Sequence, residues 1–211
     1  MESKTSNDSK QKQYLKSIVF DLNKQLGNIE YQIKEEKDNI DDIEKLILHY
    51  KENKGFILDQ TTLNYFGSVF DRTTYGVSRA TYTELVSTGD IRLLANKTKN
   101  AIIVYYQDME RRKLIIQKNN DVKDYVLNPI FFQNIDLSIE SLIKTNSKTS
   151  LSLPSQLEQT NSNLLDKNRL FEVVNIIKLK WKATYLTIDW LSEDHQKTLD
   201  LIALINNKIE H

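Results

Sequence analysis

The sequence has no cysteine, and only five glycines and two prolines among its 211 residues. Without cysteine there are no disulfides, thiolate nucleophiles or cysteine metal sites. The scarcity of glycine and proline leaves few of the turn residues that multi-stranded folds need, so long helices are favoured. Basic and acidic residues number 29 each, which leaves no net charge. A neutral chain lacks the basic field that drives nucleic-acid binding, so we expect no nucleic-acid partner.

Long hydrophobic runs and catalytic motifs are missing as well. No stretch approaches the roughly 18 to 20 apolar residues of a membrane span, and the polar start, Met1 to Gln13, has no signal-peptide core. The chain as given is therefore predicted to be soluble. It carries no glycine-rich phosphate loop, nucleophile elbow or His-Glu-x-x-His motif. These absences favour a non-enzymatic protein, for which we assign no catalytic, metal or cofactor-binding residue.

The three histidines do not form metal-ligand pairs. Helical di-metal proteins use Glu-x-x-His pairs, and neither His49 nor His195 follows a glutamate at that spacing. His195 falls in an apolar row of the last helix, where we interpret it as a hydrogen-bonded or register-setting contact; a buried pH switch is the alternative. Glu36, the polar member of a row in the first helix, is interpreted as a paired or solvent-reaching residue.

The first long element has the seven-residue apolar repeat of a coiled-coil helix. It runs from about Tyr14 to Lys54, and Gly55 is the expected left-handed cap. Residues 1–13 are predicted to be disordered or flexible. One row comprises Leu15, Leu22, Ile29, Glu36, Ile43 and Tyr50, and the other comprises Val19, Leu26, Ile33, Ile40 and Ile47.

The same repeat returns from about Asp166 to Ile209, so the chain begins and ends with matching elements. One row comprises Leu170, Ile177, Thr184, Leu191, Thr198 and Ile205, and the other comprises Val174, Trp181, Ile188, His195, Ile202 and Ile209.

Shorter helices are predicted between the two repeats. Ser78 is a candidate cap for a helix over 79–87 that Gly89 ends. Asn96 is expected to begin a long helix that Asn128-Pro129 stops, because proline donates no amide hydrogen bond and disfavours helix before it. A further helix is expected over 130–144. Residues 145–163, rich in Ser, Thr, Asn and Gln and containing Pro154, are interpreted as a surface loop.

The sequence thus predicts an all-α protein: an elongated helical bundle in which long N- and C-terminal coiled-coil-like helices pair antiparallel within one domain, 14–211. That pairing places Leu22 near Ile202 and Ile47 near Val174. The competing arrangement is a homo-oligomer, in which each first helix meets its own copy in parallel.

Charged and aromatic groups in the later helices have structural interpretations. Arg111, Arg112, Lys113 and Lys118 form a solvated helix face diluted by nearby acids, with an anion or lipid-headgroup patch as the alternative. Lys178, Lys180 and Lys182 alternate with apolar residues, which scatters them around a helix. The aromatic residues Trp181, Tyr185 and Trp190 are interpreted as core or seam residues and not as a ligand cage.

Residues Thr81 to Tyr106 contain an aromatic residue, a Leu, a Gly and an Ile-x-Leu-Leu sequence, followed by Asn and an Ile-Ile-x-Tyr-Tyr helix. This stretch resembles an uncharacterised family of Bacteroidota membrane-anchored proteins, and Tyr14-Leu15 through Asp21-Leu22 resembles the start of that family's soluble region. The matching residues are Tyr82, Leu85, Gly89, Ile91, Leu93, Leu94, Asn96, Ile102, Ile103, Tyr105 and Tyr106. The resemblance implies a membrane helix upstream of this chain and a helical domain at the periplasmic face of the inner membrane. It supplies no catalytic residues.

The leading functional hypothesis is therefore a non-enzymatic helical interaction or scaffolding domain, the extracytoplasmic part of a membrane-anchored protein whose protein partner is unknown. A ligand-sensing helical bundle is one alternative, which an apolar pocket between helices with convergent polar groups would favour. A cytoplasmic coiled-coil adaptor is another.

Overall fold

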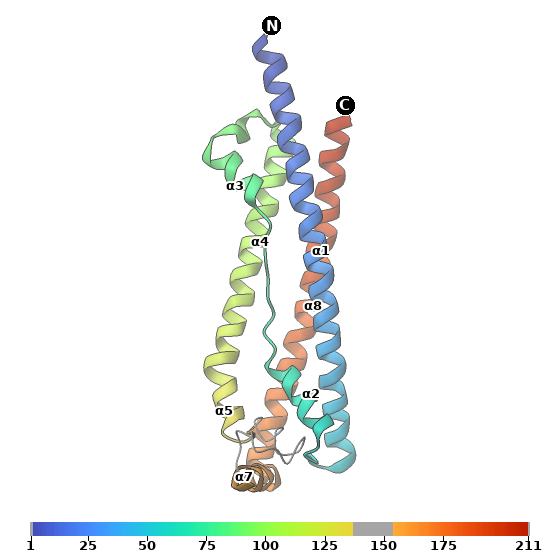
Figure 1. The fold of residues 1–211 in the computed structure, drawn as a ribbon, viewed down its shortest axis with the longest axis vertical. Coiled ribbons are helices and arrows are strands. Elements are labelled where there is room, and N and C mark those ends of the chain that lie inside the picture. Colours follow the sequence, from blue (N-terminus) through green and yellow to red (C-terminus); the bar gives the residue numbers. More distant parts are fainter. Residues whose placement is uncertain (1, 137–153, 211) are drawn as a thin grey trace. The chain divides into compact units, whose positions relative to one another are not determined.

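The computed structural model describes residues 2–136 and 154–210, and this part of the chain contains helices and no strand (Figure 1). The protein is an all-α helical bundle, as the sequence predicted. The elements are α1 (Glu2–Asn53), α2 (Gln60–Phe70), α3 (Ala80–Ser87), the 3-10 turn η1 (Asp90–Leu93), α4 (Asn96–Val122), the π-helical turn η2 (Lys123–Leu127), α5 (Asn128–Phe132), α7 (Pro154–Leu165) and α8 (Lys167–Glu210).

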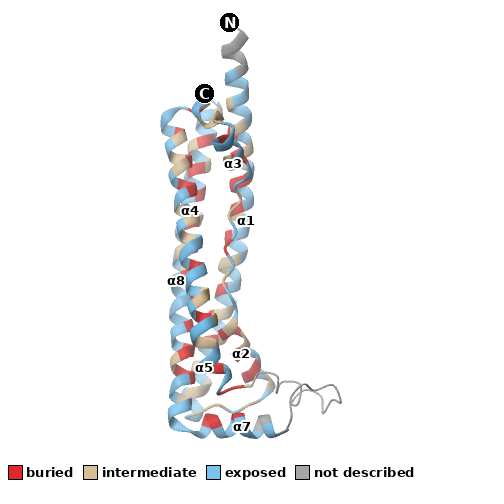
Figure 2. Ribbon diagram, turned by 90° about the vertical axis from the view of Figure 1, so that its left-hand side faces the viewer, coloured by how far each residue is buried: buried red, intermediate tan, exposed pale blue. Residues whose placement is uncertain are grey.

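The chain divides into two compact units. Unit 1 comprises Met1–Lys34, Thr74–Ile116 and Asp189–His211, and unit 2 comprises Glu35–Thr73 and Gln117–Ile188. The long helices α1, α4 and α8 contribute a segment to each unit. Figure 2 shows buried residues alternating with exposed ones along these helices, as expected when one side of a helix faces a core. The predicted single domain, 14–211, stays a prediction.

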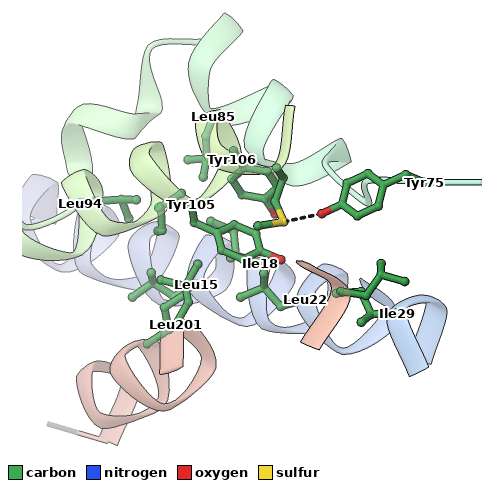
Figure 3. Packing of buried hydrophobic residues seen from close by; sticks show 14 of the residues in the cluster. Leu15, Ile18, Leu22, Ile29, Tyr75, Leu85, Leu94, Tyr105, Tyr106 and Leu201 are labelled. Carbon is green, nitrogen blue, oxygen red and sulfur yellow. Dashed lines mark hydrogen bonds between the residues drawn. The ribbon is translucent and has the colours of Figure 1, made fainter. Parts of the chain in front are cut away.

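The core of unit 1 joins apolar residues of α1, α3, α4 and α8. Leu15, Leu22 and Ile29 of α1 are buried in one cluster with Leu201 of α8 and Tyr106 of α4 (Figure 3). Ile202, the residue predicted to lie near Leu22, packs against the same cluster. Unit 1 therefore holds an early segment of α1 against a late segment of α8.

The core of unit 2 is rich in aromatic rings. Phe131 is fully buried and packs edge-on against Phe66 and Phe70, with ring centroids 5.6 and 4.4 Å apart. Ile43 and Leu46 of α1 and Val173, Ile176 and Ile177 of α8 belong to the same cluster, and Ile47 packs against it. Glu44 of α1 accepts hydrogen bonds from Trp181 and Tyr185 of α8. Here a later part of α1 meets an earlier part of α8, and the ribbons of α1 and α8 run in opposite directions within the unit (Figure 1).

Only one of the two rows predicted for each long helix is the main buried row. In α1 it contains Leu15, Leu22, Ile29, Glu36 and Ile43, and in α8 it contains Ile177, Thr184, Leu191, Thr198 and Ile205. Most members of the second rows are half-buried. In α8 a third row, Val173, Lys180, Thr187, Asp194 and Leu201, is buried instead. The buried face of α8 is therefore more polar than the seven-residue repeat suggested.

Both ends of the first helix differ from the prediction. Helix α1 begins at Glu2, so residues 2–13, predicted to be disordered or flexible, are part of the helix. That stretch holds no glycine or proline to interrupt a helix, which explains the extension. At the other end α1 stops at Asn53, and the left-handed residue is Lys54, with φ 54°, and not Gly55.

Helix α3 is not capped by Ser78, as the sequence predicted. Its N-cap position is Arg79, whose side chain makes no capping bond. The cap comes from α1, because buried Asp21 accepts a hydrogen bond from the Thr81 backbone N–H at 3.0 Å. Gln25 of α1 accepts from the Ser78 N–H and donates to the Gly76 carbonyl. A capping group distant in sequence leaves no local signature, which is why the prediction failed.

Gly89 follows α3 in the left-handed conformation that the sequence predicted, with φ 75°. A Cβ there would also approach the Arg92 guanidinium nitrogen at 2.8 Å. We expect Gly89→Ala to lower the free energy of unfolding by about 1 kcal/mol, because L-residues are disfavoured in this region. Gly27→Ala is the matched control: Gly27 lies inside α1, and nothing lies within 4 Å of the position that an alanine methyl group would take, so the change should stabilise by up to about 1 kcal/mol. Urea unfolding of both variants checks the opposite signs; equal effects would contradict the proposed role of Gly89.

Asn128-Pro129 does not stop the long helix, which was a wrong prediction. The chain stays helical from α4 through η2 into α5, of which Pro129 is the second residue. The wider π-helical turn just before the proline relieves its clash with the preceding turn.

Part of the predicted surface loop, 145–163, is helical instead. Helix α7 begins at Pro154, since proline is favoured at the first helical position, and runs to Leu165. Residues 145–153 lie outside the described residues. The helix predicted over 130–144 is described only to 136, where α5 ends at Phe132 and the remainder is a turn and coil.

Candidate functional site

The most deeply buried charge of unit 1 is Asp194 of α8, whose side chain is 0% exposed. Its carboxylate accepts a hydrogen bond from the Tyr75 hydroxyl at 2.6 Å, and that hydroxyl also lies 3.0 Å from the Met109 sulfur (Figure 3). Burial raises the pKa of Asp194, and burial together with the bond to Asp194 raises the pKa of Tyr75. Asp194 thus joins α8 to the segment between α2 and α3.

Arg112 of α4 is the cation that balances Asp194. Its guanidinium lies 3.4 Å from the Asp194 carboxylate and 2.9 Å from that of Glu193, while its side chain is only 15% exposed. The guanidinium also lies over the Trp190 ring, 5.2 Å from the centroid. The sequence placed Arg112 on a solvated face with Arg111, Lys113 and Lys118; for Arg112 that was wrong, because the side chain turns into the bundle.

Two neighbouring tyrosines of α4 are buried beside this network but differ in hydrogen bonding. Tyr105 and Thr198 share a 2.8 Å hydrogen bond, and Thr198 donates its only hydroxyl hydrogen to the Asp194 carbonyl. Tyr105 is therefore the donor to Thr198. Burial raises the pKa of Tyr105 to about 12 and raises that of Tyr106 as well. The Tyr106 ring stacks on Tyr82 at 4.3 Å, but its buried hydroxyl has no partner among the described residues.

This difference predicts opposite effects of removing one oxygen. Tyr105→Phe should lower the free energy of unfolding by about 1 kcal/mol, because it removes a buried hydrogen bond. Tyr106→Phe should leave it unchanged or raise it by about 1 kcal/mol, because an unsatisfied buried hydroxyl carries a desolvation penalty. The two variants differ from the protein by the same atom, so each is the other's control. A larger loss for Tyr106→Phe than for Tyr105→Phe would show that Tyr106 has a partner.

Unit 2 contains two buried lysines that bind the end of helix α2. Lys123 donates to the carbonyls of Phe70 and Asp71, and Lys180 donates to the same Asp71 carbonyl at 2.6 Å. These carbonyls belong to the C-terminal end of α2, where a cation complements the helix dipole. Burial, and secondarily the nearby Lys180, lowers the pKa of Lys123 to about 8; burial also lowers the pKa of Lys180.

Glu36 completes this polar cluster from α1. It is buried, and its carboxylate accepts a hydrogen bond from the Thr73 hydroxyl, while Asn120 of α4 donates to the Thr73 carbonyl. The negative charge of Glu36 acts against burial at Lys123 and Lys180 by favouring their protonated forms. The interpretation of Glu36 as a paired residue agrees with these contacts. The cluster anchors the segment that follows α2.

His195 of α8 contacts α1. His195 Nε2 lies 3.1 Å from Glu30 of α1, which agrees with its interpretation as a contact between the terminal helices. Among residues 2–136 and 154–210 no three His, Asp or Glu side chains gather in a manner that could hold a metal ion. Within the same ranges, no helix is both long and apolar enough to span a membrane.

A small polar pocket of about 290 Å³ opens in unit 1 between α1 and α3. It is lined by Lys10, Gln13, Tyr14, Ser17, Thr81 and Glu84. The Tyr14 hydroxyl donates to Asp90 at 2.7 Å, which raises the pKa of Tyr14 to about 12, and Lys10 pairs with the same carboxylate. The lining of this pocket is polar, whereas the pocket that would favour a ligand-sensing bundle is apolar.

The early part of α8 in unit 2 carries the clearest exposed feature. Trp181 and Tyr185, predicted to be core or seam residues, are 36% and 42% exposed, and both donate to Glu44 at 3.0 Å. Lys178 and Lys182 point outward, whereas Lys180 between them is buried. The three lysines are scattered around the helix, as predicted, but only two are solvated.

Sequence reasoning missed Asp194, Lys180 and Lys123 as buried charges. Asp194 and Lys180 belong to the row that repeats every seven residues through Val173, Thr187 and Leu201, and this periodicity was a usable signal. Lys123 carries no such signal, because its burial depends on the π-helical turn and on the position of α2.

No family model, no curated protein and no solved structure matches this chain.

Proposed function

We propose that this chain is a non-enzymatic helical interaction domain, which acts by presenting helix surfaces to another protein. The observation that carries the proposal is the exposure of large apolar side chains on all three long helices. Tyr31 of α1 is 63% exposed, Leu114 of α4 is 57% exposed and Phe171 of α8 is 67% exposed. On α8 the exposed rings of Trp181 and Tyr185 also lie side by side, with centroids 4.9 Å apart, and adjoining exposed apolar side chains are typical of protein-interaction sites.

The buried charged groups support the same proposal. Asp194, Arg112, Lys123 and Lys180 all bind other parts of the bundle, so their chemistry is used in holding segments together. A catalytic site would need a nucleophile or base directed at a cavity; in the polar pocket of unit 1, Tyr14 and Lys10 both bind Asp90, and the Glu84 carboxylate lies 3.4 Å from the Tyr14 hydroxyl. An interaction domain needs only a stable scaffold and an exposed face.

The resemblance over Thr81 to Tyr106 supports a location for the domain: the extracytoplasmic part of a membrane-anchored protein, at the periplasmic face of the inner membrane. A cytoplasmic coiled-coil adaptor is the alternative. Fractionation of the cells that make the protein, combined with protease treatment of spheroplasts, separates the two. Cleavage in intact spheroplasts supports the periplasmic location, and protection contradicts it.

Site-specific photocrosslinking tests the interaction proposal. A photoreactive amino acid is placed at Tyr31, Leu114 or Phe171, and at exposed Lys16 as the control site. We expect at least one apolar site to yield one discrete product that Lys16 does not. Its partner, once identified and purified, should form a complex with the unmodified chain. Failure of all three sites to crosslink above the control would overturn the proposal.

A further inference from the structure

The early part of α8 carries an outward row of residues that is both apolar and basic. The row follows the three- and four-residue spacing of one helix side, and all its members belong to unit 2. It consists of the exposed residues Lys167, Phe171, Lys178, Lys182 and Leu186 and the half-buried Asn175, and Leu179 lies beside it. Phe171, Leu179 and Leu186 are 67%, 52% and 43% exposed, and their spacing is about two helical turns.

The charge of this basic row is of one sign. It contains no Asp or Glu, although the whole chain has equal numbers of acidic and basic residues. None of Lys167, Lys178 and Lys182 pairs with an acid among the residues that the structure describes. Glu44, which borders the row, is engaged by Trp181 and Tyr185. The lysines therefore present uncompensated positive charge next to exposed apolar side chains.

We infer that the basic row docks an acidic amphipathic helix of another protein, an inference that rests on the proposed interaction function. A partner helix with leucines at heptad spacing matches the positions of Phe171, Leu179 and Leu186. Glutamates flanking those leucines complement Lys178 and Lys182. Charge complementarity of this kind selects partners and excludes basic ones.

The same charges disfavour two other occupants. In a two-fold dimer the row would face its own copy, so lysines would approach lysines. A membrane surface is disfavoured because membrane-binding helices separate a continuous apolar face from lysines at its borders. Here Lys178 and Lys182 lie within the row, between Phe171 and Leu186. Immersing those apolar side chains would carry the ammonium groups toward the acyl chains.

Binding of designed peptides to the full chain tests the inference. The probe is a helical peptide about three heptads long with leucine at the seam positions and glutamate beside them. Its control replaces each glutamate with lysine. Fluorescence anisotropy should show saturable binding of the acidic peptide alone, weakened at least about tenfold between low salt and 0.5 M salt. In a third measurement, the chain is tested for binding to vesicles of phosphatidylserine and phosphatidylcholine.

Charge reversal locates the site. Lys178→Glu with Lys182→Glu should weaken binding of the acidic peptide at least about tenfold. Lys12→Glu with Lys16→Glu, on exposed positions of α1, changes the net charge equally and should leave binding unchanged. Three results would each overturn the inference. The first is equal binding of the acidic and the basic peptide, and the second is an equal loss of binding in both double variants. The third is binding of the chain to vesicles without binding to the acidic peptide. If the basic row fails these tests, crosslinks at Tyr31 or Leu114 would still support the proposed interaction function. Failure of the inference can therefore be distinguished from failure of the proposed function.

Discussion

Replacing Arg112 with leucine is expected to lower the free energy of unfolding by about 3 to 5 kcal/mol, because it leaves the fully buried Asp194 carboxylate without its cation. Tyr75 would remain as a hydrogen-bond donor but cannot neutralise the charge. The neighbouring Arg111→Leu is the matched control. Arg111 is 77% exposed and lies 3.7 Å from Asp108, so its loss should change stability by less than about 0.5 kcal/mol.

A second substitution distinguishes the lost charge from lost packing. Asp194→Asn removes the charge that Arg112 balances, so in the Arg112→Leu background it should restore part of the stability. Urea unfolding of the single and double variants gives the coupling energy. If the Arg112→Leu and Arg111→Leu variants are equally stable, the ion pair does not stabilise unit 1. The same conclusion follows if Asp194→Asn does not raise the free energy of unfolding in the Arg112→Leu background.

The second large effect is expected in the aromatic core of unit 2. Phe131→Ala should destabilise by about 3 to 5 kcal/mol, because it removes a fully buried ring and leaves a cavity beside Phe66 and Phe70. Phe132→Ala is the control from the adjacent position. Phe132 is 51% exposed, stacks on Phe70 and meets the Phe131 ring edge-on with centroids 6.2 Å apart, so we expect its replacement by alanine to destabilise by only about 1 kcal/mol.

The readout for this pair should be specific to unit 2. Hydrogen exchange of α2 and α5 should accelerate in Phe131→Ala, because the ring joins these two helices. Phe132→Ala should exchange at nearly the original rate. Similar exchange in both variants would mean that the burial of Phe131 contributes less than its contacts suggest.

The helical class and one buried row of each terminal helix were predictable from the sequence. Leu15, Leu22 and Ile29 repeat every seven residues, and such periodicity is a property of local sequence. The left-handed Gly89 was predictable for the same reason, since a local conformation selects glycine. These features need no knowledge of which segments meet.

The capping of α3 and the end of α2 could not be predicted, because their partners are distant in sequence. Asp21 reaches the N–H of Thr81, and Lys123 and Lys180 reach the carbonyl of Asp71. No sequence pattern near Thr81 or Asp71 predicts these contacts. The continuation of helix past Pro129 was missed because a π-helical turn accommodates the ring. The exposed basic row of α8 was missed because alternating lysines were considered without knowing that Lys180 turns inward.

The buried lysines of unit 2 have a consequence for the fold in alkaline solution. Lys123 has a pKa of about 8 in the fold, against an ordinary value of 10.5, so between these pH values the unfolded chain binds a proton that the folded chain does not. Raising the pH through this window therefore favours the folded state, by up to about 3 kcal/mol from this residue. Above about pH 10 the sign reverses, because buried Tyr75, Tyr105 and Tyr106 resist an ionisation that is easy in the unfolded chain. The unfolding free energy should thus be greatest near about pH 10, a maximum that Lys123→Met would move toward neutral pH in a series of urea titrations.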